Sequence, residues 1–199
     1  MATRIGVSDL YAFILEEDTK AGVAYGDPFR IAKAIEVTIN PQVQDASLYA
    51  DDALSEYYSA VTAFDITLNV DDLTPEVRGK LLGLEPDENG MIVQTNQITA
   101  PNVAIAFRSK RSDGSYEYRN QYKVKFNPTE DRYETQGENI NFQTPTITGR
   151  AMALDYDGSY GAYVIGTDEN KELTDKWFEE VQGKFNTTSD SDVSDPLIP

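Results

Sequence analysis

TAFDITLNV, residues 62–70, places an apolar side chain at every second position. Phe64, Ile66, Leu68 and Val70 fall on one side of an extended chain, and Ala63, Asp65, Thr67 and Asn69 fall on the other. A β-strand has this two-residue period because successive side chains point to opposite faces of the sheet. The segment therefore predicts a strand with one buried face and one polar face.

The same alternation extends over most of residues 30–127. In residues 31–39 it predicts one face from Ile35, Val37 and Ile39, and the opposite face from Ala34, Glu36 and Thr38. Val103, Ile105 and Phe107 likewise face away from Ala104, Ala106 and Arg108. In the next segment one face is predicted to hold Tyr116, Tyr118, Tyr122, Val124 and Phe126, and the other Glu117, Arg119, Gln121, Lys123 and Lys125. Further strands are predicted at 10–16, 43–50, 91–98 and 132–144.

Turn and cap residues separate these segments. Ser112–Ser115 contains Asp-Gly and predicts a hairpin, and Asp157-Gly158 is expected to join strands near 146–156 and 159–166. A helix is expected at 74–83, where a Thr cap and a first-turn Pro precede a closing Gly. A second helix is expected at 170–183, because Leu173, Trp177 and Val181 recur at helical spacing.

These elements predict a mainly β (α+β) protein: an antiparallel β-sandwich or barrel-like fold with one or two short flanking helices. Residues 1–185 are expected to form a single domain. Residues 186–199 are rich in Ser, Thr and Asp and are expected to form an acidic, flexible tail.

Charge and residue usage narrow the function. Of the 199 residues, 17 are Lys or Arg and 34 are Asp or Glu, so the formal net charge is −17. A chain with this negative charge repels nucleic-acid phosphates and anionic lipids. Ordinary nucleic-acid binding and docking on an anionic membrane leaflet are therefore disfavoured. The chain has no Cys and no His, which excludes disulfides, thiolate or imidazole metal sites, and Ser-His or Cys-His catalysis. What remains is carboxylate, Lys or Tyr chemistry, or no catalysis at all. Of these we expect no enzyme activity, and we expect no cofactor.

The start of the chain gives no sign of export. Residues 1–9 lack the layout of a secretory signal, and the apolar run at 10–15 is too short to span a bilayer. We expect a soluble protein made inside a cell.

Three sets of residues keep other functions open. Each of the acid doublets Asp51-Asp52 and Asp71-Asp72 could supply half of the catalytic carboxylate pair of a glycosidase. Neighbours on a strand point to opposite faces, however, and acids commonly begin turns. Turns at 87–90, 155–159 and 168–170 offer oxygen ligands for calcium, without the full spacing of an EF-hand. The tyrosines of 116–122 suit a sugar-stacking platform. A carbohydrate- or calcium-binding β-sandwich module of a surface protein is therefore the alternative function.

Basic residues gather near the predicted hairpin at 112–115. The candidate patch consists of Lys110, Arg111, Arg119, Lys123 and Lys125. On so acidic a chain, this patch is expected to meet acidic surface on another copy. The residues thus favour an assembly subunit over an enzyme.

Ordered segments along the chain resemble the major tail proteins of long-tailed bacteriophages, of the phi13 type. The resemblance covers roughly residues 5 to 165 and includes Ile5–Ala12, Ser47–Asp52, Pro101–Phe107 and Glu138–Thr144. None of these segments is a chemical signature. Their specificity lies in their order and spacing.

The resemblance implies a structural subunit of a non-contractile tail tube. Six copies would close a ring, and rings would stack into a hollow conduit for DNA, assembled in the host cytoplasm and carried in the virion. Tape-measure, tail-terminator and distal tail proteins are the implied partners. Residues 40–60 and 108–120 are candidate arms for contacts between copies. The acids Glu36 and Asp65 are expected to face the lumen, where they would keep DNA from adhering.

Overall fold

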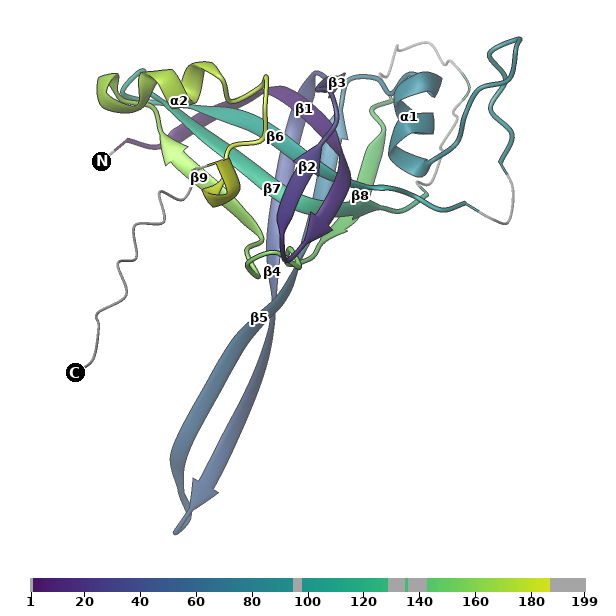
Figure 1. Ribbon diagram of the computed structural model, residues 1–199. Coiled ribbons are helices and arrows are strands. Elements are labelled where there is room, and N and C mark those ends of the chain that lie inside the picture. Colours follow the sequence, from purple (N-terminus) through teal and green to yellow (C-terminus); the bar gives the residue numbers. More distant parts are fainter. Residues whose placement is uncertain (1, 95–97, 129–134, 136–142, 187–199) are drawn as a thin grey trace, which may run out of the picture.

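A computed structural model describes residues 2–94, 98–128, 135 and 143–186 (Figure 1). The strands are β1 (Arg4–Thr19), β2 (Gly22–Tyr25), β3 (Phe29–Ala32), β4 (Ala34–Ala50), β5 (Ala53–Val70), β6 (Asn102–Arg111), β7 (Tyr116–Phe126), β8 (Thr146–Ala151) and β9 (Gly161–Ile165). The helices are α1 (Pro75–Leu82) and α2 (Lys171–Asp175), and short 3₁₀ turns cover Asp168–Asn170 and Lys184–Asn186.

Within the described residues, the strands form one antiparallel sheet in the order β2-β1-β6-β7-β8-β5-β4. β3 pairs with β1, and β9 pairs with β7. Ile66 of β5 and Val103 of β6 belong to one buried cluster, although two strands separate β5 from β6 in the sheet. The sheet is therefore curled over one of its faces, which confirms the predicted mainly β, sandwich-like fold with two short helices.

The centre of the sheet is buried on both faces. Val103 and Ile105 lie in the cluster enclosed by the curl, while Ala104 and Ala106 lie in a second cluster on the opposite face. The second cluster is covered by Trp177 and Val181 of the C-terminal segment. The predicted opposition of these β6 residues is confirmed.

Helix α1 has the predicted caps. The Oγ1 of Thr74 accepts a hydrogen bond from the backbone N–H of Val77 at 3.4 Å, and Gly83 ends the helix in a left-handed conformation with φ of 70°. A Cβ at Gly83 would lie 2.3 Å from the carbonyl oxygen of Thr99, so only glycine fits there. Leu81 seals the end of the core inside the curl.

A β-bulge changes the predicted face of Ile35. Ala34 pairs with Val70, but Glu36 pairs with Asn69, so one extra residue lies between these pairs. Ile35 is consequently 52% exposed, whereas Val37 and Ile39 pack against the core. The prediction that all three share one face is wrong.

A second irregularity divides the predicted apolar face of β7. The pairing passes from Val103–Val124 to Ile105–Gln121, which leaves three β7 steps opposite two in β6. Tyr118 and Tyr122 therefore lie in the cluster under Trp177, while Val124 and Phe126 lie in the cluster inside the curl.

The C-terminal helix is shorter than predicted. Helix α2 ends at Asp175, and a hydrogen bond from Trp177 N to Thr174 O at 3.3 Å begins a tighter turn. Leu173 is 41% exposed, while Trp177 and Val181 are 2% and 3% exposed. The chain thus delivers Trp177 and Val181 to the core through a turn, and not on the face of one helix.

The predicted turns and remaining strands have mixed outcomes. The hairpin at 112–115 is confirmed, since Gly114 N donates to Arg111 O at 3.0 Å. Asp157-Gly158 is a turn between β8 and β9, but those strands pair with β7 and not with each other. No strand covers the described part of 91–98, where Ile92 forms an isolated bridge with Pro86. Most of 132–144 lies outside the described residues, as does the predicted tail after 186.

A small ionic cluster ties β1 to β7. The Nζ of Lys123 lies 2.6 Å from Asp18 Oδ2 and 2.8 Å from Asp155 Oδ2, and the side chains of Lys123 and Asp18 are 13% and 7% exposed. Burial opposes ionisation of Asp18, but hydrogen bonds from Lys123 and from the backbone N–H of Asp155 and Tyr156 outweigh it and lower the pKa of Asp18. The cluster therefore stabilises the fold as long as both partners are charged.

Replacing Asp18 by Asn should lower the free energy of unfolding by about 3 kcal/mol at pH 7, because Lys123 loses its buried counter-charge. A lowered folded-state pKa gives stability that is complete above the ordinary carboxyl value and is lost as the pH falls through the folded-state pKa. The difference between wild type and Asp18→Asn should therefore be complete at pH 7 and should shrink as the pH falls below the ordinary carboxyl value toward the folded-state pKa of Asp18. Urea unfolding at a series of pH values from 7 downwards measures it.

The matched control is Asp155→Asn. Its carboxylate is 69% exposed, so we expect a loss below about 1 kcal/mol. Equal losses in the two variants would contradict the assigned role of Asp18.

Candidate functional site

The most prominent surface feature is a two-stranded arm, defined as residues 43–61 of β4 and β5. Within the described residues, β5 pairs with β8 over residues 64–69, and beyond that point β4 and β5 pair only with each other. The arm projects from the body as a twisted ribbon (Figure 1). At ~3.3 Å per residue, the span from Val43 to Asp51 is about 26 Å.

The arm carries large apolar side chains that are open to solvent. Tyr49 is 69% exposed and Tyr58 is 68% exposed. The other members of this set are 42–59% exposed: Val43, Leu48, Leu54, Tyr57 and Val61. Soluble monomers rarely gather so many apolar side chains at one projecting site, and such gatherings mark interaction surfaces.

Register assigns most of these side chains to one face of the arm. Val43 pairs with Val61, Ser47 pairs with Tyr57 and Tyr49 pairs with Leu54, all at alternate positions of β4. Leu48 and Tyr58 lie on the other face with Glu56. Apolar side chains therefore lie on both faces of the arm, and the sequence of residues 40–60 lacks the apolar-polar alternation of the other strands. This missing alternation is the sequence signal for the arm.

The arm is also acidic. Residues 41–61 contain four carboxylates and no Lys or Arg; the four are Asp45, Asp51, Asp52 and Glu56. Asp51 and Asp52 form the turn at its tip, with φ of 50° and 58°, as a two-residue hairpin of this type requires. Asp71 accepts a hydrogen bond from the backbone N–H of Lys33 at 3.0 Å. Both acid doublets thus occupy turns and lie apart from each other in the fold.

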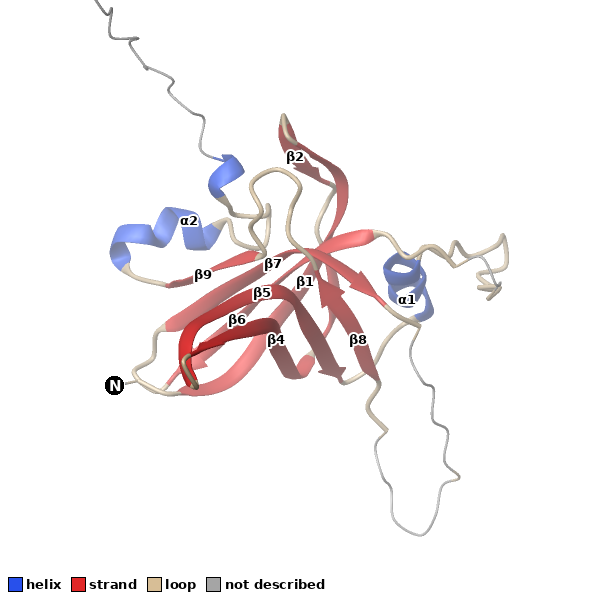
Figure 2. Cartoon of the chain, turned by 90° about the horizontal axis from the view of Figure 1, so that it is seen from below, coloured by secondary structure: helices blue, strands red, loops and turns tan. Residues whose placement is uncertain are grey.

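The predicted lumen acids lie on an exposed polar face of β4, β5 and β8. Figure 2 shows these three strands side by side. The face consists of Glu36, Thr38, Asn40, Asp65, Thr67, Asn69, Thr146, Thr148 and Arg150. Asp65 accepts hydrogen bonds from Arg150 Nε at 2.8 Å and Gln42 Nε2 at 2.7 Å, so its charge is compensated. Glu36 is exposed and accepts a hydrogen bond only from Thr38 among the described residues.

The predicted basic patch is distributed over both faces of the sheet. Lys123 is held by Asp18 and Asp155 inside the chain. Arg119 pairs with Phe107, whereas Lys110 lies three residues further along β6 and so on the opposite face. The bulge in β7 places Lys125 on that opposite face as well, beside Arg150.

Arg111 lies at the end of the β6–β7 hairpin. Its Nη2 donates to the carbonyl of Ala2 at 3.1 Å, while its Nε is buried and has no hydrogen-bond partner among the residues that the structure describes. A contact between copies by Lys110, Arg111, Arg119, Lys123 and Lys125 together stays a prediction. Of these, Arg111 and Arg119 share one face.

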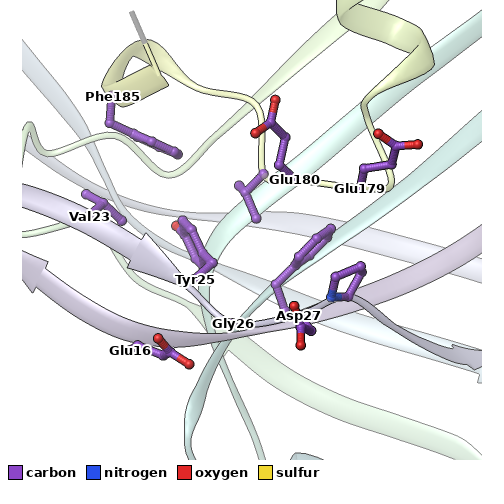
Figure 3. A pocket seen from close by; sticks show the side chains of 11 residues that line it. Glu16, Val23, Tyr25, Gly26, Asp27, Glu179, Glu180 and Phe185 are labelled. Carbon is purple, nitrogen blue, oxygen red and sulfur yellow. The ribbon is translucent and has the colours of Figure 1, made fainter. Parts of the chain in front are cut away.

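A cavity of about 490 Å³ lies between the β1–β2 hairpin and residues 179–185 (Figure 3). Its apolar part includes Val23, Tyr25 and Phe185, and the Tyr25 hydroxyl donates to Tyr122 O at 3.1 Å. Burial raises the pKa of Tyr25, so this phenol stays protonated. Four exposed carboxylates surround the opening: Glu16, Asp27, Glu179 and Glu180. The cavity is therefore unsuited to phosphates, and neither predicted acid doublet lines it.

Two of the three turns considered for calcium, at 87–90 and 155–159, use a carboxylate internally. Asp157 Oδ1 accepts from the backbone N–H and the hydroxyl of Ser159, and Asp87 Oδ1 accepts from the N–H groups of Asn89 and Met91. In the described part of the chain, no three Asp or Glu side chains are gathered for a metal ion. None of the helices described there has the length and apolar character needed to cross a bilayer.

Comparison with known proteins assigns most of the chain to one family. A search of curated proteins gave no match. The family model described as phage tail tube protein matches residues 32–190, which include both strands of the arm and the whole sequence from β4 to β9. The chain therefore belongs to the phage tail tube proteins, structural components of the virion tail that assemble into a tube.

Proposed function

We propose that this protein closes into rings, that the rings stack, and that the resulting conduit passes DNA from the capsid to the host. The observation that carries this proposal is the arm, with seven large apolar side chains exposed on a ribbon that projects beyond the body. An isolated two-stranded hairpin is marginally stable in water. The apolar side chains of the arm gain packing contacts when the arm lies against another copy.

The position of the arm favours an extended assembly. The arm projects from one side of the body (Figure 1), and in our proposal the surface that receives it on another copy is part of the body and not a second arm. Such heterologous contacts generate rings when the rotation closes and filaments when it does not. A tube of stacked rings uses both kinds of contact, and six copies in each ring is the number that the family resemblance implies.

The polar face of β4, β5 and β8 is our candidate for the lumen wall. Threonine and asparagine side chains dominate it, Asp65 is compensated by Arg150, and Glu36 keeps a free charge. A protein that grips DNA does so by replacing counterions with Lys and Arg. This face offers few such contacts, so a sliding duplex would not adhere to it.

The remaining parts of the proposal follow from the tube. Subunits assemble in the host cytoplasm around a tape-measure protein, and the tube ends on tail-terminator and distal tail proteins. The subunit needs no cofactor and performs no catalytic step. Its free energy of association drives construction of the tail.

Replacing residues 45–59 by a two-residue Asn-Gly turn should abolish assembly while the body stays folded, because the β4–β5 pairing of residues 34–42 with 63–70 is kept. Wild-type protein at high concentration should form rings or tubes in negative-stain micrographs, and the shortened variant should sediment as a monomer. The control lengthens the exposed β1–β2 turn by one glycine after Lys20 and leaves the arm intact. Tubes from the arm-shortened variant would contradict the proposal.

Glu36→Lys should turn a non-adhering lumen into one that retains DNA. Six substitutions per ring add positive charge at regular intervals along a duplex, and the retention should fall steeply with salt. Co-sedimentation of short duplex DNA with preformed tubes at 50 and 200 mM salt measures it. Glu172→Lys makes the same charge change on exposed α2 and should retain no DNA. Equal retention by the two variants would contradict the lumen assignment of Glu36.

A further inference from the structure

The outer end of the sheet carries a second exposed apolar surface, on β9. Tyr163 is 73% exposed and Ile165 is 41% exposed. Cross-strand pairing places Tyr163 beside Arg119 and Ile165 beside Glu117, so the four side chains share one face. We call these four residues the platform. β9 pairs only with β7 in the described part of the chain, so the platform lies at a free sheet edge.

Arg119 is the platform's positive charge, and it is only partly compensated. Its guanidinium lies 5.8 Å from the ring centroid of Tyr163, and its buried Nε has no hydrogen-bond partner among the described residues. The charge of Glu117 on the same face favours the ionised form of Arg119, but Glu117 accepts its two hydrogen bonds from Arg4, at 2.6 and 3.0 Å. Burial, followed by the charge of Arg4, lowers the pKa of Arg119. Arg119 therefore has no carboxylate of its own among the described residues.

The arm offers that carboxylate together with matching apolar groups. Asp45 pairs with Ser59, and Tyr57 is its diagonal neighbour on the same face of the arm. The side chain of Asp45 is exposed, and its carboxylate makes no hydrogen bond or ion pair in the described part of the chain. The arm thus presents an acid beside a tyrosine, and the platform presents an arginine beside a tyrosine.

The arm of a given copy does not reach its own platform. The hydroxyl of Tyr160, just before β9, donates to the carbonyl of Val61 at 3.2 Å, which fixes the base of the arm next to the start of β9. From this base the ribbon runs away from the body and stays paired to its tip (Figure 1). A second copy is therefore the source of the arm that fits the platform.

We propose that the arm of one copy docks on the platform of the next, with Asp45 paired to Arg119 and Tyr57 packed against Tyr163. This contact rests on the proposed tube function and names the surface that receives the arm. The opposite charges of the two surfaces set the register, and the tyrosines supply the buried area. Because arm and platform differ, each copy both gives and receives one contact, which propagates the assembly.

Disulfide trapping tests the contact directly, because the chain has no cysteine of its own. A mixture of Tyr57→Cys and mass-tagged Tyr163→Cys copies should give a cross-linked heterodimer under mild oxidation, since a disulfide requires Cα atoms within about 7 Å. The control pair is Tyr57→Cys with Leu173→Cys, which is exposed on α2. We expect about tenfold more product from the platform pair, and equal yields would overturn the proposal.

A charge exchange gives the second test. Arg119→Glu should raise the concentration needed for tube formation about tenfold or more, and adding Asp45→Arg should restore assembly. Lys20→Glu, the same charge change in the exposed β1–β2 turn, should have no effect. If wild type and Arg119→Glu form tubes at the same concentration, the proposed docking is refuted, but the tube function is not. Wild type that never assembles would refute the tube function itself.

An alternative to be tested is that the acidic residues 187–199 of the same chain bind the platform in place of the arm. Ser191→Cys combined with Tyr163→Cys tests it within one chain. Efficient intramolecular cross-linking there, with none between Tyr57→Cys and Tyr163→Cys, would overturn the proposal.

Discussion

The burial of strand β6 on both faces is the constraint on which the rest of the structure depends. Val103 and Ile105 need an apolar cover on one side, and the curl of β5 and β8 over that side supplies it. Ala104 and Ala106 are small, so the opposite face has room for a large ring, and Trp177 fills it. A central strand with two apolar faces thus explains both the curl of the sheet and the C-terminal segment that covers the other face.

Strands β4 and β5 extend far beyond what this core requires. They contain 17 and 18 residues, but β5 meets β8 over only six pairs. The surplus has exposed edges and exposed tyrosines, features that invite association with other chains. In a monomer this surplus would be a hazard for aggregation. In our proposal, the same features serve as a directed contact between copies in the tube.

The sequence predicts the parts of the fold that depend on local rules. The alternation around Ile66, the cap at Thr74 and the Asp-Gly hairpin all appear as expected, because two or three neighbouring residues determine each of them. The bulge at Ile35 and the split of β7 depend on pairing with distant strands, so no pattern within the segment reveals them. Leu173 shows the same limit, since helical spacing alone does not say where a helix ends.

For the candidate surfaces too, the sequence predicts the general character but not the positions of the residues. Composition indicates an acidic assembly subunit, but proximity on the chain does not place the basic residues in space. Lys123 lies four residues from Arg119, yet β7 changes face between them, and Lys123 ends in an internal cluster with Asp18. Arg119 instead lies beside Tyr163, a residue 44 positions away that only the β7–β9 pairing brings there. The net charge of −17 therefore has a local structure: acids gather on the arm and around the cavity, while Arg119 of the platform forms no ion pair among the described residues. In our proposal, this separation of charge lets identical acidic chains attract one another at one surface while the rest of their surfaces repel.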